Sequence, residues 1–306
     1  MQPCVCIIIL NWNGYEVTKE CLHSLYKINY ANYKIILVDN GSVDGSVDKL
    51  RADFSDFPVD FVALDKNHGF TGGNNLGIKY AAEKYTPDYF LLLNNDTTVN
   101  ESFLEIMVGT FSTNSKCYAV VPKIYYYDRP DILWYAGGGI SKITGIVQHY
   151  GINKKDSPEY SIPKEVDFMN GCTALISKES VADLGILDEI FFANSEDADY
   201  SLRILNSDHI ILYAPEAVIY HKVSHSFKSN KGKWFTFYMA TRNIIFLQRK
   251  HLPGFLMPAF FLIFGIRWMG YLTIKLFFLR DFKSIKGIYV GLVDGFLNRK
   301  QIRSSL

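Results

Sequence analysis

The sequence predicts an α/β fold, with a mostly parallel central sheet flanked by helices and a basic, apolar helical region at the C-terminal end. Three observations support this fold class. Short apolar runs alternate with longer amphipathic segments, several runs are apolar at every position, and the charge balance changes sign late in the chain. Strands that are apolar on both sides are typical of parallel sheets buried between layers of helices.

The alternation of strand and helix patterns covers the first 123 residues. Apolar runs predict five strands, and the amphipathic segments between them predict four helices. The strands are expected at residues 4–10, 34–39, 59–64, 89–94 and 118–123, and the helices at 17–25, 46–53, 72–84 and 102–112. Open sheets of this kind bind ligands beyond the carboxyl ends of their strands, so the polar residues there are candidate binding residues.

Further along the chain the pattern is less regular. Residues 132–166 are rich in Gly and Tyr, and predict irregular strands and loops over the sheet. A strand is expected near 172–177, a helix near 196–205, short strands at 210–213 and 218–220, and a helix over 233–250. This organisation predicts a first domain of residues 1–228 and a helical region of residues 229–306.

The net charge of +1 over 306 residues hides two unlike parts. Residues 1–225 hold 18 Lys and Arg against 29 Asp and Glu, whereas residues 226–306 hold 14 against 2. In the second part, residues 252–274 are apolar apart from Arg267. Apolar helices bordered by basic residues favour a membrane surface over nucleic acid, so we expect a helical pair that lies on the membrane. A spanning or re-entrant segment, and a helix buried against the first domain or in a homodimer, are the alternatives.

The cysteines and the N-terminal run exclude two classes of protein. Five cysteines without a CxxC pair suggest neither a disulfide framework nor a zinc site, and favour a reducing compartment. The apolar run at residues 4–10 lacks a basic leader, so we interpret it as a buried strand and not as a signal peptide.

Two positions suggest a metal site. Asp96 ends the polar tripeptide that follows the strand at 89–94, where one carboxylate could hold Mg²⁺ or Mn²⁺ if substrate phosphates supply other ligands. His221 follows the strand at 218–220, and neutral imidazole is a good ligand for Mn²⁺. Asp96 could also simply lead into the next helix, and His221 could be structural.

An acidic cluster suggests a general base. Glu196, Asp197 and Asp199 lie at the expected start of a helix, where acidic residues are ordinary because of the helix dipole. The preceding Phe191 and Phe192 are less ordinary, since apolar neighbours desolvate a carboxylate and raise its proton affinity.

A glycine-rich segment at residues 69–77 suggests an anion site at the start of a helix. It does not have the GxGxxG spacing, which occurs nowhere in the chain. A dinucleotide-dependent dehydrogenase is therefore not favoured.

The order of five segments is more specific than any one of them. Residues 7–13, 37–46, 67–77, 91–97 and 191–203 together closely resemble the family 2 glycosyltransferases, and within them the bacterial rhamnosyltransferase branch. The resemblance covers about residues 4–250. It implies the GT-A nucleotide-sugar-binding fold, with the nucleotide in the first half of the domain and the acceptor in the second.

The resemblance also assigns roles to individual residues. It implies that Asp39 recognises a pyrimidine edge, that Asp96 and His221 hold Mg²⁺ or Mn²⁺, and that Asp197 is the catalytic base beside Glu196. The remaining expected nucleotide-sugar contacts are Asn11, Asn13, Asn67, Gly73, Asn74, Asn95 and Arg242. The family's metal motif usually has more carboxylates, and here amides at positions 94 and 95 leave only Asp96.

The implied activity is inverting, metal-dependent transfer of a sugar from a nucleotide-diphosphate donor to a hydroxyl of a glycan or lipid-linked saccharide. L-Rhamnose from dTDP-rhamnose is the first candidate, for bacterial cell-surface polysaccharide at the cytoplasmic face of the cell membrane. A UDP-hexose or UDP-N-acetylhexosamine transferase and a non-catalytic nucleotide-sugar-binding subunit are the alternatives. A processive synthase is not favoured, because one apolar segment does not build a translocation channel.

Overall fold

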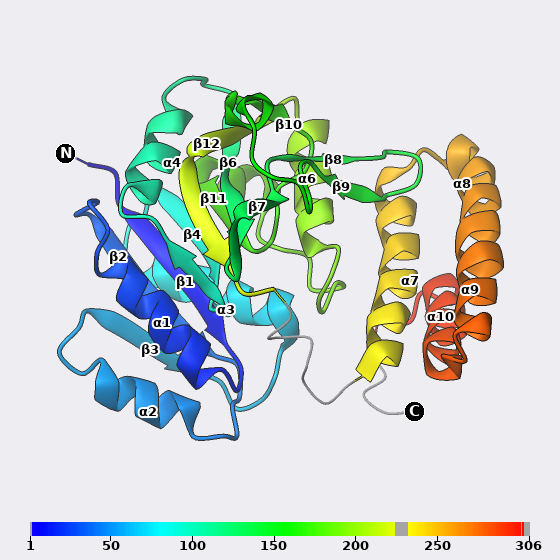
Figure 1. Ribbon diagram of the computed structural model, residues 1–306, viewed down its shortest axis with the longest axis horizontal. Coiled ribbons are helices and arrows are strands. Elements are labelled where there is room, and N and C mark those ends of the chain that lie inside the picture. Colours follow the sequence, from blue (N-terminus) through cyan, green and yellow to red (C-terminus); the bar gives the residue numbers. More distant parts are fainter. Residues whose placement is uncertain (1, 224–231, 301, 303–306) are drawn as a thin grey trace.

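The computed structural model describes residues 2–223, 232–300 and 302, and consists of a sheet domain beside a group of helices (Figure 1). The strands are β1 (Val5–Asn11), β2 (Tyr33–Asp39), β3 (Val59–Ala63), β4 (Tyr89–Asn94), β5 (Thr97–Val99), β6 (Cys117–Tyr126), β7 (Arg129–Tyr135), β8 (Gly138–Ile140), β9 (Val147–His149), β10 (Lys164–Val166), β11 (Thr173–Ser177) and β12 (Ile210–His221). The helices are α1 (Tyr15–Leu25), α2 (Ser46–Asp53), α3 (Gly69–Lys84), α4 (Phe103–Phe111), η1 (Pro158–Ser161), α5 (Lys178–Leu184), α6 (Glu196–Asn206), α7 (Gly232–His251), η3 (Gly254–Leu256), α8 (Met257–Phe264), η4 (Gly265–Leu272), α9 (Thr273–Phe278) and α10 (Phe282–Phe296).

The central sheet has the strand order β10-β12-β6-β11-β4-β1-β2-β3. Its half built from β1 to β4 is parallel, as expected for strands connected by helices. The second half is mixed, because β11 runs antiparallel to both β4 and β6. The predicted α/β class with flanking helices is confirmed, and the parallel pairing is concentrated in the N-terminal half.

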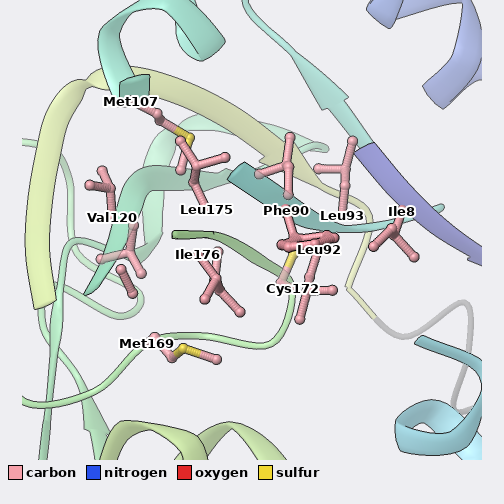
Figure 2. Packing of buried hydrophobic residues seen from close by; sticks show 14 of the residues in the cluster. Ile8, Phe90, Leu92, Leu93, Met107, Val120, Met169, Cys172, Leu175 and Ile176 are labelled. Carbon is pink, nitrogen blue, oxygen red and sulfur yellow. The ribbon is translucent and has the colours of Figure 1, made fainter. Parts of the chain in front are cut away.

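The main core lies on both faces of this sheet. Ile8, Phe90, Leu92 and Leu175 are among its buried side chains, and they come from β1, β4 and β11 (Figure 2). Because consecutive residues of a strand point to opposite faces, a run such as residues 90–93 must be apolar throughout when helices cover both sides. The continuous apolar runs of the sequence have this cause.

Several elements differ from the sequence predictions. The two short strands expected at residues 210–213 and 218–220 are one long strand, β12, with a register shift between Ala214 and Val218. The irregular region at 132–166 contains the end of β7, the β8–β9 hairpin and β10 at the sheet edge. Helix α5 and strand β5 were not expected. All of these depend on pairing or packing with distant segments, which local periodicity does not report.

The helical region does not begin where the sequence division places it. The predicted boundary between residues 228 and 229 lies outside the described residues. Helix α7 follows this boundary in the sequence, yet it contributes Phe246 and Leu247 to the main core of the sheet domain. A second, smaller core joins α7 to α8 through Ile245, Phe260 and Phe264. Helix α7 therefore belongs to both parts.

Helices α7 and α10 pack at close range. Gly287, Gly291 and Gly295 recur every fourth residue of α10 and face α7. A Cβ atom on Gly291 would lie 2.5 Å from the Tyr238 carbonyl oxygen, and one on Gly287 would lie 2.2 Å from the Trp234 carbonyl oxygen. This spacing of small residues lets two helix backbones approach closely.

The other face of the helical region is apolar and exposed. Among the described residues, 14 of the 21 large hydrophobic side chains that are exposed lie between Phe255 and Leu297. The stretch Gly254–Phe278 is long and apolar enough to cross a membrane, and only 11% of its apolar window is buried. The alternative in which this stretch is a helix buried against the first domain is therefore wrong.

Candidate active site

The carboxyl ends of β1 and β2 form a closed polar network. Asn11 and Asp39 are paired in the sheet register, and the Asn11 amide donates to the Asp39 carboxylate over 2.7 Å. The Ser42 backbone N–H and hydroxyl also donate to Asp39, over 3.0 and 2.6 Å. Asn11 has no exposed surface, and its carbonyl oxygen accepts from Thr18. Asn11 therefore holds Asp39 and its loop in place and does not itself face a ligand.

Other predicted nucleotide contacts lie on the loops around this network. Asn13 is exposed, and its side-chain oxygen accepts from the Val43 N–H over 2.9 Å. The Asn67 side chain accepts from the Gly69 N–H over 2.8 Å. Asn95 is partly exposed and donates to the Thr18 hydroxyl over 2.7 Å and to the Asn11 side-chain oxygen over 3.4 Å, so it joins the end of β4 to α1 and β1. These loops form the rim of the sheet edge.

The glycine-rich start of α3 has a packing role that the sequence did not indicate. A Cβ atom on Gly73 would lie 2.3 Å from Leu10, and one on Gly77 would lie 2.5 Å from Ile8. Asn74 is 2% exposed and donates to the Phe70 carbonyl oxygen within the helix. Gly73 and Asn74 thus face the protein interior, because α3 must lie directly on β1.

Asp96 and His221 meet at the edge where β5 pairs with the end of β12. The Asp96 carboxylate and the His221 Nε2 atom are 3.1 Å apart, and the two residues are 2% and 7% exposed. Burial disfavours the charged imidazole, but the Cys172 thiol and the Asp96 carboxylate outweigh it and raise the pKa of His221 to about 10. The structure therefore brings together the two residues predicted to bind a metal.

The donor atoms of this pair fit a small divalent cation. A carboxylate oxygen and a neutral imidazole nitrogen are both ligands that Mn²⁺ accepts. Without a metal the raised pKa keeps the His221 imidazole protonated and paired with Asp96 over 3.1 Å, so a bound cation would take the place of that proton. The described residues contain no group of three or more His, Cys, Asp or Glu side chains that could hold a metal. Asp96 and His221 can thus supply two ligands, and the others must come from water or from substrate phosphates.

An aromatic wall borders this pair. The Trp134 ring meets the His221 ring edge-on, with centroids 4.5 Å apart, and meets His149 in the same manner at 4.9 Å. Burial lowers the pKa of His149, so its imidazole is neutral at neutral pH. His149 also contacts the Asn170 amide over 3.2 Å.

The acidic pair Glu196 and Asp197 begins α6. Burial raises the pKa of Glu196 well above its usual range, and Asp197 adds to this by repulsion. Among the described residues, the Glu196 Oε2 atom has no hydrogen-bond partner. Burial also raises the pKa of Asp197, but its carboxylate accepts from the N–H groups of Gly171 and Ala198 over 3.1 and 2.8 Å. Asp197 keeps part of its surface exposed, whereas Glu196 is 6% exposed.

A turn that the sequence analysis did not single out links the two sites. Residues 170–172 precede β11, where the Gly171 N–H donates to Asp197 and the Cys172 thiol lies beside His221. The Asn170 side chain closes the turn by accepting from the Cys172 N–H over 2.7 Å. The Asn170-Gly171 pair just before an apolar strand is the sequence signal that could have predicted this turn.

Arg242 lies elsewhere than expected. Its side chain has no exposed surface, and its N–H groups donate to the backbone carbonyls of Ile190, Arg299 and Lys300. These bonds occupy the guanidinium, so in this arrangement Arg242 does not reach a diphosphate. It ties α7 to the loop before α6 and to the residues after α10.

Comparison with known proteins identifies the family. The family described as "Glycosyl transferase family 2" matches residues 6–185 of this chain, which is more than half of its length. The chain is a family 2 glycosyltransferase. The match includes Asp39, Asp96 and the turn at 170–172, and ends before the acidic pair.

Two curated relatives are similar to this glycosyltransferase at low identity. Rhamnosyltransferase WbbL of Escherichia coli is 26% identical over 260 residues, which cover 81% of this chain and 94% of WbbL. Low-salt glycan biosynthesis hexosyltransferase Agl10 of Haloferax volcanii is 26% identical over 208 residues, covering 64% of this chain. The aligned part spans only 60% of the length of Agl10.

A solved structure confirms the GT-A fold of this glycosyltransferase. Mannosyltransferase PcManGT from Pyrobaculum calidifontis, in complex with GDP-Man and Mn²⁺, superposes with a TM-score of 0.62 at 13% identity. The superposition covers 98% of this chain and 88% of PcManGT. At this identity the similarity establishes the fold alone.

Proposed function

We propose that this chain is an inverting glycosyltransferase that moves a sugar from a nucleotide-diphosphate donor to a hydroxyl of a glycan or lipid-linked saccharide acceptor. The observation that carries the proposal is the turn at residues 170–172. One side of it contacts Asp197, a carboxylate with a raised pKa, and the other contacts His221 beside Asp96. The candidate base and the candidate cation site therefore lie on either side of the same turn, residues 170–172.

The properties of the acidic pair suggest which residue is the base. Glu196 is the more buried of the two, and burial together with the neighbouring Asp197 charge favours its protonated form. Asp197 is accessible, and two N–H groups favour its ionised form. Asp197 removes the proton from the acceptor hydroxyl, whose oxygen attacks the anomeric carbon from the face opposite the departing nucleotide. The configuration at that carbon is inverted.

A divalent cation bound by Asp96 and His221 would stabilise the negative charge that develops on the leaving diphosphate. The chain's own residues prepare for this in two ways. Their burial weakens the competition of water for the cation. The turn at 170–172 holds Asp197 through the Gly171 N–H and brings the Cys172 thiol beside His221. Mg²⁺ and Mn²⁺ both suit an oxygen and imidazole ligand set completed by phosphate.

L-Rhamnose from dTDP-rhamnose is the first candidate donor, because WbbL is similar to this chain over nearly its whole length. Agl10 favours the alternative of another hexosyl donor. The cellular role proposed is the synthesis of bacterial cell-surface polysaccharide at the cytoplasmic face of the membrane.

The exposed apolar face of the helical region supports attachment to an anionic membrane. Exposed Phe277, Phe278 and Phe282 lie next to the exposed cations Lys275 and Lys283. Apolar side chains that insert at the interface and cations that bind anionic headgroups reinforce one another. A helix of 25 residues is about 37 Å long, so Gly254–Phe278 could also span a core of about 30 Å. Arg267 within it favours the surface position.

A nucleotide-release assay tests the catalytic proposal. Purified protein is given Mg²⁺ or Mn²⁺ with dTDP-rhamnose, UDP-sugars or GDP-sugars and a lipid-linked saccharide acceptor, and Asp197→Asn serves as the control. Metal-dependent release of dTDP that the variant lacks supports rhamnosyl transfer. Release from a UDP-sugar alone would identify that sugar as the donor instead of dTDP-rhamnose. No release from any donor would contradict the proposed activity.

Vesicle binding tests the membrane proposal. The double variant Lys283→Gln and Lys286→Gln should bind anionic phosphatidylglycerol vesicles about 30-fold more weakly, at about 1 kcal/mol for each lysine. Phosphatidylcholine vesicles are the control lipid. Self-association without lipid would indicate a dimer interface, and extraction only by detergent would indicate a spanning helix. Either result contradicts surface attachment.

A further inference from the structure

The loop before α6 has an unusual backbone. Asn194 and Ser195 are consecutive residues with positive φ, at 67° and 76°, and they directly precede Glu196 and Asp197. Residues other than glycine avoid this region, and Ser has little of the tolerance that Asn shows. Such a conformation persists only where the surrounding structure enforces it, and it occurs preferentially at functional sites.

Asn243 of α7 supplies that enforcement. Its side-chain amide donates to two successive carbonyls, those of Ala193 and Asn194, over 2.9 and 2.6 Å. The side chain has no exposed surface, so water does not compete for these bonds. The two bonds fix the carbonyls of Ala193 and Asn194, and Asn194 is the first of the two residues with positive φ.

Arg242 fixes the orientation of that amide. Its guanidinium donates to the Asn243 side-chain oxygen over 2.7 Å. Arginine can only donate and backbone carbonyls can only accept, so the amide nitrogen must face the loop. A second guanidinium bond to the Ile190 carbonyl, over 3.2 Å, holds the same loop further upstream.

The loop is also held from the opposite side, by α3. The Thr71 N–H donates to the Phe192 carbonyl over 3.2 Å, and the Asn75 amide donates to Leu187 over 2.9 Å. These contacts end at Phe192. The two residues with positive φ are held instead by α7 and by the Asp199 N–H, which donates to the Ser195 carbonyl over 2.9 Å.

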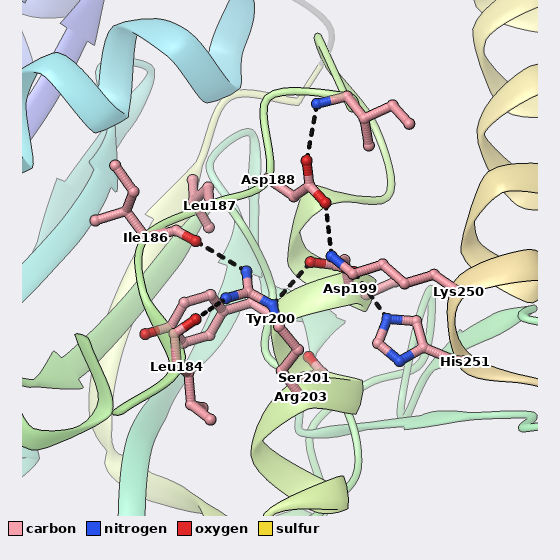
Figure 3. Close-up of polar contacts among 12 residues, drawn as sticks. Leu184, Ile186, Leu187, Asp188, Asp199, Tyr200, Ser201, Arg203, Lys250 and His251 are labelled. Atoms are coloured by element: carbon pink, nitrogen blue, oxygen red, sulfur yellow. Dashed lines mark hydrogen bonds and ion pairs between the residues drawn. The ribbon is translucent and has the colours of Figure 1, made fainter. Parts of the chain in front are cut away.

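The far end of α7 is joined to α6 as well. Lys250 and His251 contact the buried Asp199 carboxylate over 2.8 and 2.7 Å, and Lys250 also pairs with Asp188 over 2.6 Å (Figure 3). Within α6, Arg203 also forms an ion pair with Asp199, over 2.9 Å. Helix α7 thus contacts the loop directly before α6 and Asp199 within α6, on both sides of Asp197 in the sequence.

We propose that Asn243 is a positioning residue that sets the direction of the Asp197 carboxylate through the strained residues Asn194 and Ser195. The inference rests on the proposed function in which Asp197 is the base. It also gives α7 a role beyond anchoring, because the helix that carries Asn243 packs directly against α10 of the membrane-facing region. The same helix, α7, therefore supports the proposed membrane-attached region and positions the proposed base.

The test compares two variants of nearly equal volume on α7. Asn243→Asp keeps the size and the Arg242 partner, but replaces the donating amide with an oxygen that can only accept. Thr241→Val is the matched control: Thr241 has no exposed surface and accepts from Trp268 Nε1 over 2.8 Å, away from the loop. Asn243→Ala repeats the test without an added charge if the Asp variant does not fold.

We expect Asn243→Asp to lower kcat by about 10- to 100-fold, since small misplacements of a catalytic group have effects of this size. The Kd for the released nucleotide with Mn²⁺ should stay within about threefold of wild type, because the proposed nucleotide contacts lie in the first half of the domain. Thr241→Val should keep kcat near the wild-type value. Equal kcat for the two variants, whether both fall or neither does, would overturn the proposal.

A second readout does not depend on activity. Hydrogen exchange of the backbone amides of residues 193–198 should become faster in Asn243→Asp and remain unchanged in Thr241→Val. Unchanged exchange in Asn243→Asp would refute the positioning role. If wild-type protein transfers no sugar, the proposed function fails, while the exchange measurement still decides whether Asn243 holds the loop.

Discussion

The sheet domain and the helical region differ in where their large apolar side chains lie. The sheet domain buries apolar side chains on both faces of β1 and β4, and its site is a set of carboxylates partly shielded from water. The helical region leaves many of its large apolar side chains exposed, and buries polar ones along α7 and α10, such as Arg242, Asn243 and Asp294. The buried polar side chains of the helical region form hydrogen bonds that hold their partners in fixed positions. The difference teaches that α7 links the exposed apolar surface of the helical region to the loop before α6.

The largest expected loss of kcat distinguishes the roles of the two acidic residues, Glu196 and Asp197. Asp197→Asn should lower kcat by about 10³-fold or more, because it removes the proposed base. Glu196→Gln should lower kcat by no more than about tenfold, since an amide resembles the protonated carboxyl that burial favours. Single-turnover rates measure both. A stronger loss in Glu196→Gln than in Asp197→Asn would exchange the two roles.

The next effect concerns the cation pair. Asp96→Ala should weaken Mn²⁺-dependent nucleotide binding by at least about tenfold, because one of two protein ligands is lost. Calorimetry with and without Mn²⁺ measures this, and binding without the metal is the internal control. Equal loss in the two titrations would mean that Asp96 shapes the site and does not bind the cation.

The pH dependence of kcat sharpens the assignment of the base. Burial raises the pKa of Asp197, and only the ionised form accepts the hydroxyl proton. Activity should therefore be constant at higher pH and fall about tenfold for each pH unit below that pKa. The midpoint should lie above about 3.9, the usual value for aspartate. Asp197→Asn should lose this acidic limb, and a wild-type profile that is flat down to that value would argue against Asp197.

The smallest effect compares two helical glycines, one in each region. Gly291→Ala should destabilise the protein by about 1–2 kcal/mol, because its Cβ would overpack the α7 backbone. Gly109→Ala in α4 meets nothing within 4 Å, so it should stabilise by about 0.5–1 kcal/mol through reduced backbone entropy. Urea unfolding measures both. Stabilisation by Gly291→Ala would show that α10 does not pack on α7 so closely.

The positions of Asp39, Asp96, Glu196 and Asp197 could be predicted because each follows or begins an element that its own neighbours define. Apolar runs end at Asp39 and Asn94, and the acidic cluster opens a helix with a regular apolar pattern. These signals act over a few residues. The order of the family motifs along the chain then identified the family.

The roles of Gly73, Asn11 and Arg242 could not be predicted in the same way. Whether a glycine faces a phosphate or a leucine depends on how closely α3 approaches β1. Whether an arginine meets a diphosphate or three backbone carbonyls depends on where α7 docks. Both are settled by packing between segments that are distant in the sequence.

The sequence by itself determined the α/β alternation, the polar ends of the strands, the family and the basic, apolar character of the C-terminal region. Tertiary structure alone decided that β12 brings His221 to Asp96, that the turn at 170–172 joins them to Asp197, and that Asn243 holds the strained loop. The physical reason is the range of the forces involved. Periodicity and turn chemistry act along a few residues of chain, whereas hydrogen-bond partners across the fold exist only once the sheet order and helix packing bring them together.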